Sequence, residues 1–196
     1  MTERTRAELT RCPWCGTDPL YVEYHDKEWG KPLYDNQKLF EFLLLEGAQA
    51  GLSWITVLRK RENYRVAFDN FNPEKIARYT DVKKAKLLLN EGIIRNRLKV
   101  DSAVKNANAY LAMQKNGEDF SEFLWNFVGG KPLQNKHKTT STIAASTPES
   151  DAMSKALKQK GFNFVGTTIC YAFMQATGMV NDHIASCHKY PSYSSK

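Results

Sequence analysis

The chain of 196 residues lacks any long apolar run. A membrane-spanning helix needs about 18 consecutive apolar residues. The N-terminal stretch MTERTRAELTR also carries charges where a signal peptide has its apolar core. These absences argue against membrane proteins and exported proteins, so we expect a cytoplasmic protein without membrane contacts.

Cysteine is scarce as well, with Cys12, Cys15, Cys170 and Cys187 as its only occurrences. In a reducing compartment such cysteines bind a metal or lie buried more often than they form disulfides. A disulfide-stabilised scaffold is therefore not expected. It is also unnecessary, because a chain of this length can bury a complete hydrophobic core.

Strand signals are few, whereas helix starts and ends recur. Asp35 or Asn36 can cap a helix through KLFEFLLLEG, and Ser53 can cap one through WITVLRKRENYRVAF. Further helices are expected from Asn72-Pro73, from Asp81 to Gly92, over VDSAVKNANAYLAMQKNG and over FSEFLWNFVGG. The sequence predicts an all-α fold in one domain, 1–196. The ends, 1 to about 10 and 191–196, offer no apolar surface and are expected to be poorly ordered.

The segment KPLQNKHKTTSTIAASTPESD lacks helical periodicity until Thr147-Pro148. We interpret it as a connecting loop. A solvated linker is the favoured interpretation, and a loop that touches phosphates through its basic residues is the alternative.

A helix, a turn and a second helix are predicted over about 151–178, in DAMSKALKQKGFNFVGTTICYAFMQATG. Glycines at 161 and 166 would allow positive φ and let a phosphate approach the backbone, while the N–H groups at Thr167-Thr168 point at the anion. Such a hairpin can hold a DNA backbone without reading sequence. The net charge of +7 favours a polyanionic partner. An ordinary helical turn is the alternative.

Metal-ligating side chains occur near both ends of the chain. His183 and Cys187 are four residues apart in NDHIASCHKY, and RCPWCGTDPLYVEYHD offers Cys12, Cys15 and His25. Two ligands from each end would form a closed tetrahedral zinc site. Generic spacing favours Cys12 with Cys15, whereas Cys12 with His25 requires a longer loop.

An aromatic cluster accompanies one carboxylate within an apolar stretch. LYVEYHDKEWG contains Tyr21, Tyr24 and Trp29, and FEFLLLEGAQAGLSW contains Glu46 and Trp54. Aromatic planes beside an acid suit an extruded nucleobase, which needs stacking on its faces and a polar group at its edge. On composition alone, packing of these aromatic side chains in a core is the favoured interpretation.

Long motifs in this chain match a known family. DPLYVEYHDKEWG, LEGAQAGLSWITVLRKRENYR, GIIRNRLKV, FLWNFV, SKALKQKGFNFVGTTICYAFMQATGMVNDH and the final Cys187 resemble bacterial 3-methyladenine DNA glycosylase I, a family of the helix-hairpin-helix DNA glycosylase superfamily. The resemblance extends from about Arg11 to Tyr190. It implies a DNA glycosylase of base excision repair that flips the nucleotide out and hydrolyses the N-glycosidic bond of 3-methyladenine in alkylated double-stranded DNA. The expected product is free 3-methyladenine, and the expected state is a monomer.

The resemblance also implies a role for particular residues. A structural zinc ion would be held by Cys12, His25, His183 and Cys187, which decides against Cys15. The base pocket would use Glu46, Tyr24 and Trp54, with Tyr21 and Trp29 nearby. The DNA backbone would lie along the hairpin at Gly161, Val165, Gly166, Thr167 and Thr168.

Two features depart from the wider superfamily. Its V-D-x-H pattern has an aspartate two residues before the histidine, and here VNDH has Asn181 there, with Asp182 one position off. The resemblance therefore gives Asp182 no catalytic role. The hairpin lysine of superfamily members with lyase activity is also missing, since Val165 precedes Gly166 and threonines follow it. A monofunctional enzyme is expected.

Methylation at N3 makes adenine cationic and weakens its glycosidic bond, so little acid–base machinery is needed. An ionised Glu46 in a dry site would attract the cationic base more than neutral adenine and accept a hydrogen bond from its amine. We expect Glu46 to be the catalytic residue and to lie at a helix end, where Gly47 and Gly51 leave room for the base. Water is then expected to attack the sugar cation that remains. The rival hypotheses are a DNA-binding module without turnover and a structural zinc protein.

Overall fold

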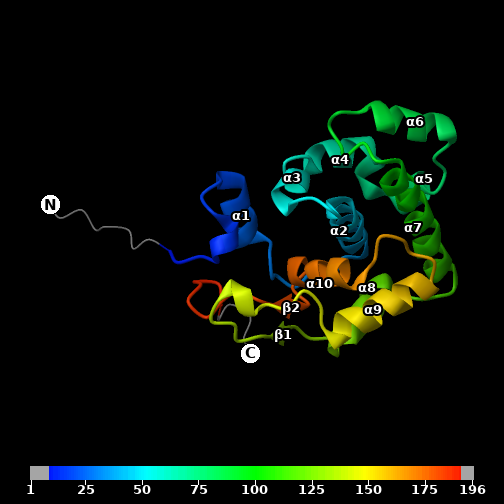
Figure 1. Cartoon of the computed structure of the whole chain (residues 1–196). Coiled ribbons are helices and arrows are strands. Elements are labelled where there is room, and N and C mark those ends of the chain that lie inside the picture. The colour runs from blue at the N-terminus through cyan, green and yellow to red at the C-terminus, as the bar shows by residue number, and fades with distance from the viewer. Residues whose placement is uncertain (1–8, 191–196) are drawn as a thin grey trace.

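The computed structural model describes residues 9–190, and this part of the chain is mostly helical (Figure 1). The expectation for the two ends therefore falls almost wholly outside the described residues. Within residues 9–190 no helix is both long enough and apolar enough to cross a membrane. The helices and strands are η1 (Pro13–Cys15), α1 (Pro19–Lys27), α2 (Asn36–Gln49), α3 (Trp54–Leu58), α4 (Arg61–Ala67), η2 (Asp69–Phe71), α5 (Pro73–Ile76), α6 (Asp81–Leu89), α7 (Arg97–Lys115), α8 (Phe120–Trp125), η3 (Asn126–Val128), β1 (Leu133–Gln134), η4 (Thr140–Thr142), α9 (Pro148–Gln159), α10 (Thr167–Ala176) and β2 (Val180–Asn181).

Most of the helix starts follow the capping signals. The Asp35 side chain accepts a hydrogen bond from the N–H of Lys38, and α2 begins at Asn36, directly after this cap. Asn72 caps α5 in the same way. The helix expected from Asp81 is capped one residue earlier, by Thr80, and it ends before Asn90 rather than at Gly92.

The single helix expected after Ser53 is in fact two, α3 and α4. The apolar stripe of α3 buries Trp54, Val57 and Leu58. A continuous helix would carry this stripe to positions 61, 62 and 65, which hold two arginines and a glutamate. The chain turns between the two helices, and Arg61 pairs with Glu28.

Helix α2 lies at the centre of the fold and contacts α3, α7, α8 and α10 (Figure 1). Its buried side chains include Leu39, Phe40, Leu43 and Leu45, each almost without exposure to solvent. Helix α10 packs against both α9 and α2. The last turns of α2 and the N-terminal half of α10 are thereby held beside each other.

A short parallel bridge adds two strands of two residues each to the mostly helical fold, and it corrects the expectation of a purely solvated linker. The strand β1, within the Ser/Thr-rich segment, pairs with β2 in the register Leu133 to Val180 and Gln134 to Asn181. The N–H of Leu133 donates to the carbonyl of Met179 at 2.9 Å, and the N–H of Asn135 donates to that of Asn181 at 3.2 Å. A strand of two residues shows no period in a sequence. The bridge holds the 131–147 segment against the C-terminal part of the chain.

Two backbone segments cross closely at Gly178. The N–H of Gly30 donates to the carbonyl of Gln175, and the N–H of Leu33 donates to that of Thr177, each at 3.0 Å. Gly178 has a φ of +70°, and a Cβ added there would lie 2.2 Å from the carbonyl carbon of Lys31. Only glycine fits this crossing.

We expect Gly178→Ala to lower the free energy of unfolding by roughly 3–5 kcal/mol, because it combines a backbone clash with left-handed strain. Gly117→Ala is the matched control: its φ is +76°, but an added Cβ meets nothing within 4 Å. It should cost only about 1 kcal/mol. Urea unfolding of both variants measures the difference, and equal losses would contradict the close crossing.

Candidate functional site

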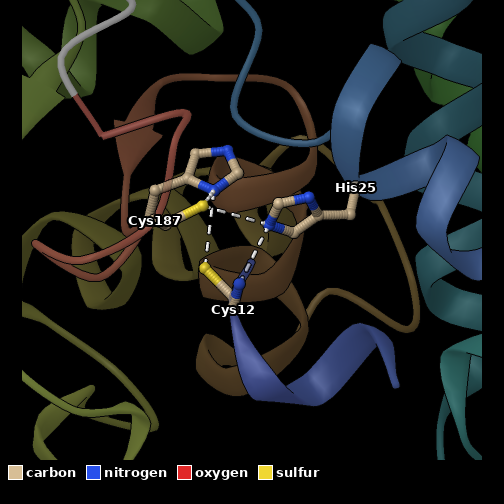
Figure 2. Close-up of side chains that lie close together, drawn as sticks. Cys12, His25 and Cys187 are labelled. Atoms are coloured by element: carbon tan, nitrogen blue, oxygen red, sulfur yellow. Dashed lines mark hydrogen bonds between the residues drawn. The ribbon is translucent and has the colours of Figure 1, made fainter. Parts of the chain in front are cut away.

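Four buried side chains from the two ends of the described chain meet at one point. The ligand atoms of Cys12, His25, His183 and Cys187 all lie within 4.8 Å of one another. Cys12 precedes η1, His25 lies on α1, and Cys187 follows β2; their side chains converge (Figure 2). The sulfur of Cys187 lies 3.4 Å from the ring nitrogen of His25, and the sulfur of Cys12 lies 3.5 Å from that of His183. In a tetrahedral zinc site with usual bond lengths, a sulfur and a nitrogen ligand are about 3.6 Å apart. This cluster can hold one metal ion.

Neighbouring groups orient both histidines of the cluster. His25 Nδ1 lies 2.8 Å from a carboxylate oxygen of Asp26, and His183 Nε2 lies 3.2 Å from the carbonyl of Trp29. These oxygens only accept, so the ring nitrogens that face them carry the protons and the opposite nitrogens face the thiols. Partial burial acts to raise the pKa of Asp26, but hydrogen bonds from Arg11 and His25 outweigh it and lower the pKa to about 2. The lone pairs of both histidines are therefore directed at the metal position.

The two cluster thiols shift each other's pKa in opposite directions. Their mutual hydrogen bond, together with burial, raises the pKa of Cys12, and the same hydrogen bond lowers the pKa of Cys187, with help from His183 and His25. Cys15 is buried, but its thiol donates to the carbonyl of Cys12 at 3.2 Å and takes no part in the cluster. The alternative that spacing left open is thus closed by geometry. Cys170 is buried in α10, as expected.

A cavity of about 310 Å³ lies between α1, α2 and α10. It is lined by Trp14, Tyr21, Tyr24, Trp29, Glu46, Gln49, Trp54, Thr140, Ile143, Ala172 and Gln175. The predicted aromatic side chains and the predicted carboxylate thus surround one space. Tyr24 and Trp54 adjoin each other there, with ring centroids 5.5 Å apart.

Glu46 is the buried carboxyl group of this cavity. Its side chain is 3 % exposed, and its Oε2 atom has no hydrogen-bond partner among the described residues. Burial raises the pKa of Glu46 to about 8. A carboxyl with this pKa is mostly protonated at pH 7, in contrast to the ionised group expected from the sequence.

The two glycines near Glu46 differ in their surroundings. Gly47 lies inside α2 and faces the hairpin, since an added Cβ would lie 3.2 Å from Cβ of Phe164. Gly51 has a φ of +78° in the turn after α2, with nothing within 4 Å of an added Cβ. Gly47 does not line the cavity, whereas Gly51 lines an adjoining hollow of about 360 Å³ that also contains Glu46. Gly47 permits close packing of the hairpin on α2, and Gly51 permits the turn.

Two tryptophans connect the metal cluster with the cavity. The Trp29 ring lies edge-on to His183 at 4.6 Å, and Trp14 lies 4.9 Å from Trp29 and 5.3 Å from His25. Both indoles also line the cavity. One wall of the cavity is therefore supported by the metal cluster.

Sequence reasoning did not identify six of the lining residues, namely Trp14, Gln49, Thr140, Ile143, Ala172 and Gln175. Trp14 lies between the candidate ligands Cys12 and Cys15, and this position could have indicated it. Thr140 and Ile143 belong to the segment that was interpreted as a linker. The β1–β2 bridge and the hydrogen bond from the N–H of Ala185 to the carbonyl of His137 hold this segment beside the cavity.

The hairpin between α9 and α10 has one of the two predicted positive-φ glycines. Gly161 has a φ of +93°, but Gly166 has a φ of −61° and forms the N-cap of α10. Phe164, which is not a glycine, has a φ of +55°. Asn106 of α7 holds the turn, because its amide accepts from the N–H of Asn163 at 2.7 Å and donates to the carbonyl of the same residue at 3.0 Å.

The hairpin residues predicted to contact a DNA backbone differ in the groups that they leave accessible. The Val165 side chain is buried and its carbonyl accepts from Ser154, so its N–H is the polar group left for a ligand. The Thr167 hydroxyl pairs with that of Ser150 at 2.8 Å. Thr168 is exposed in the first turn of α10. Lys155 and Lys158 are exposed on the preceding helix.

Asp182 is held in place by hydrogen bonds inside the protein. It is fully buried and accepts hydrogen bonds from Tyr171, Gln175 and Asn135 at 2.6–2.8 Å. Asn181, in the superfamily's aspartate position, is also buried and accepts the N–H of His183. Neither of them lines the cavity.

Comparisons with known proteins agree with this geometry. The family described as Methyladenine glycosylase matches residues 14–190. A DNA-3-methyladenine glycosylase of Haemophilus influenzae is 56% identical over 178 residues, which cover 91% of this chain and 96% of the relative. A crystal structure of 3-methyladenine DNA glycosylase I has a TM-score of 0.92 at 55% identity and covers 93% of this chain and 100% of that one. A variant of 3-methyladenine DNA glycosylase I in complex with 3-methyladenine has a TM-score of 0.89 at 37% identity, covering 94% and 99%.

Proposed function

The chain belongs to the methyladenine glycosylase family, and from this premise we propose that it is a monofunctional DNA glycosylase of base excision repair. It hydrolyses the N-glycosidic bond of 3-methyladenine in alkylated double-stranded DNA after flipping the nucleotide into the cavity. The observation that carries the proposal is the buried Glu46 with its unpartnered Oε2, set among aromatic rings. It works as a monomer of one domain in the cytoplasm.

The cavity suits a flat, positively charged ring. Tyr24 and Trp54 give it aromatic faces, and Tyr21 and Trp29 extend this surface. Stacking and hydrogen bonds there offset the few kcal/mol that unstacking the nucleotide costs. Neutral adenine gains the stacking without the charge attraction, so the electrostatic interaction provides the selectivity.

The raised pKa of Glu46 makes this selectivity depend on proton release. When the cationic lesion enters, its charge favours the ionised carboxylate, and the proton leaves to solvent. The carboxylate then accepts a hydrogen bond from the exocyclic amine. The bond to the sugar breaks, the base takes the bonding electrons and becomes neutral, and water adds to the sugar cation. Glu46 is the catalytic residue because it touches the reacting base.

The hairpin is proposed to hold the DNA backbone at Gly161, Val165, Gly166, Thr167 and Thr168. The first N–H groups of α10, a helix of ten residues, offer donors to a phosphate. Contact with phosphates positions the duplex without reading its sequence. Lys155 and Lys158 add positive charge on α9.

We expect Thr168→Glu to weaken binding to duplex DNA about tenfold and to flatten its salt dependence, because the new carboxylate repels a phosphate. An acid in the first turn of a helix favours the helix, so unfolding would not explain the loss. Fluorescence anisotropy at several salt concentrations measures it. Binding of free 3-methyladenine serves as the control and should stay unchanged; an unchanged DNA affinity would remove the hairpin from the interface.

The cluster of Cys12, His25, His183 and Cys187 is proposed to hold one structural zinc ion. Two thiolates and two oriented imidazoles are ligands that zinc prefers, and four protein ligands leave no open position for substrate. The ion would lock η1 to the C-terminal segment and take no part in the reaction.

Release of 3-methyladenine from methylated duplex DNA tests the proposed function. The enzyme should release the free base and leave the backbone uncut. A module that binds damage without turnover would bind the lesion and release nothing. A structural zinc protein would show neither binding nor release.

A further inference from the structure

Gln175 lies in the last turns of α10, where its half-buried side chain lines the cavity with Glu46. Its main chain is fixed, since its carbonyl accepts the N–H of Gly30 at 3.0 Å. The residue belongs to no motif singled out in the sequence. What it presents to the cavity depends on which way its amide group is turned.

Asp182 settles the orientation of this amide. Its Oδ2 atom accepts from Nε2 of Gln175 at 2.8 Å and from the hydroxyl of Tyr171 at 2.6 Å. Burial, together with Asp182, raises the pKa of Tyr171, so this hydroxyl keeps its proton and donates. On its other oxygen Asp182 accepts from Asn135 at 2.7 Å. A carboxylate offers only acceptors, so the NH₂ group of Gln175 must face it.

The amide oxygen of Gln175 is consequently turned away from Asp182. Among residues 9–190 no group donates a hydrogen bond to this Oε1 atom, and it is not fully enclosed. Oε2 of Glu46 is a second acceptor without a partner in the same cavity. The cavity thus offers two free acceptors, which match the two N–H bonds of an exocyclic amine.

We propose that Gln175 is a second specificity-determining residue, whose amide oxygen accepts one N–H of the exocyclic amine of the bound purine while Glu46 accepts the other. This inference rests on the proposed function. Asp182 is the positioning residue, because it binds the NH₂ group and leaves the oxygen as the free end of the amide. A purine with a carbonyl at C6 would set its own acceptor against these two and be rejected.

A cycle of residue and ligand changes tests this contact. Isothermal titration measures the binding of 3-methyladenine and of 3-methylpurine, which has hydrogen in place of the amine, to the wild type and to Gln175→Met. The methionine removes the acceptor at similar length. We expect the preference of the wild type for 3-methyladenine to fall about tenfold in Gln175→Met, with less than a twofold change for 3-methylpurine.

Two further variants complete the experiment. Gln114→Met, on α7 outside the cavity, is the matched control and should keep the wild-type preference. Gln175→Glu should keep most of it, because a carboxyl that shares a proton with Asp182 still turns an oxygen to the cavity. Equal weakening of both ligands by Gln175→Met, or lost preference in Gln175→Glu, would overturn the assignment. Failure of the proposed function would differ, since the wild type itself would then neither bind nor release 3-methyladenine.

Discussion

Glu46→Gln is expected to weaken the binding of free 3-methyladenine roughly 10- to 100-fold and to slow its release from DNA at least as much. The glutamine loses a hydrogen bond to an ionised acceptor, which contributes about 1.5–3 kcal/mol. In DNA, where the methylated base is cationic, it also loses the charge attraction. Titration of the free base and single-turnover release from methylated duplex DNA measure the two effects.

Glu41→Gln is the matched control for this variant. Glu41 is a second buried glutamate of α2, but it pairs with Arg65 and does not line the cavity. Its substitution should leave the affinity for 3-methyladenine unchanged. Equal affinities of wild type and Glu46→Gln would exclude Glu46 as the residue that holds the base.

The same substitution has an expected effect on stability. In the folded protein Glu46 keeps its proton up to about pH 8, whereas in the unfolded chain it loses the proton near the ordinary glutamate pKa of about 4.5. Between these values the unfolded state binds fewer protons, so the free energy of unfolding falls as the pH rises, by up to about 1.4 kcal/mol per pH unit. Glu46→Gln should remove this slope and be more stable than the wild type at pH 8, with no such gain at pH 4. If the free energies of unfolding of the wild type and of Glu46→Gln changed in parallel between pH 4 and pH 8, Glu46 would not be a buried acid without a charged partner.

Loss of the metal is expected to have the second large effect. Cys187→Ser should abolish the single equivalent of bound zinc and lower the melting temperature by about 10 °C, which corresponds to several kcal/mol in a chain of this size. Metal analysis and calorimetry measure both quantities. We also expect weaker base binding, because Trp14 and Trp29 line the cavity and contact His25 and His183 of the cluster.

Cys15→Ser is the control that the chain itself offers. Cys15 is as buried as Cys12 and only three residues away, but its sulfur lies outside the cluster. Its hydroxyl replacement can still donate to the carbonyl of Cys12. This variant should keep one equivalent of zinc. A zinc-free wild type with an unchanged melting temperature would refute a structural metal.

Local signals predicted the helical parts of the fold well. The Asp35 and Asn72 caps are formed as expected, and both helices of the hairpin region are where the sequence placed them. Such signals act over three or four residues, so a sequence displays them directly. The family resemblance assigned Glu46 and the aromatic side chains to one base pocket, and in the structure they line one cavity.

Features that depend on distant contacts were not predictable in the same way. Thr140 reaches the cavity because long-range backbone contacts, the two-residue bridge among them, hold its segment. Gln175 in an amphipathic helix resembles any half-exposed glutamine, and its orientation comes from Asp182. The protonated state of Glu46 at pH 7 likewise arises from complete desolvation, which the leucines before it suggest but cannot establish.

The distance along the chain between the cluster ligands has a consequence for biosynthesis. Cys12 and His183 are in contact although they are 171 residues apart in the sequence, so Cys12 leaves the ribosome long before His183 is synthesised. Closing so long a loop is slow and entropically unfavourable until the helices between them have packed. The newly made protein would therefore acquire its aromatic wall last, and partly synthesised chains would be unable to engage damaged bases.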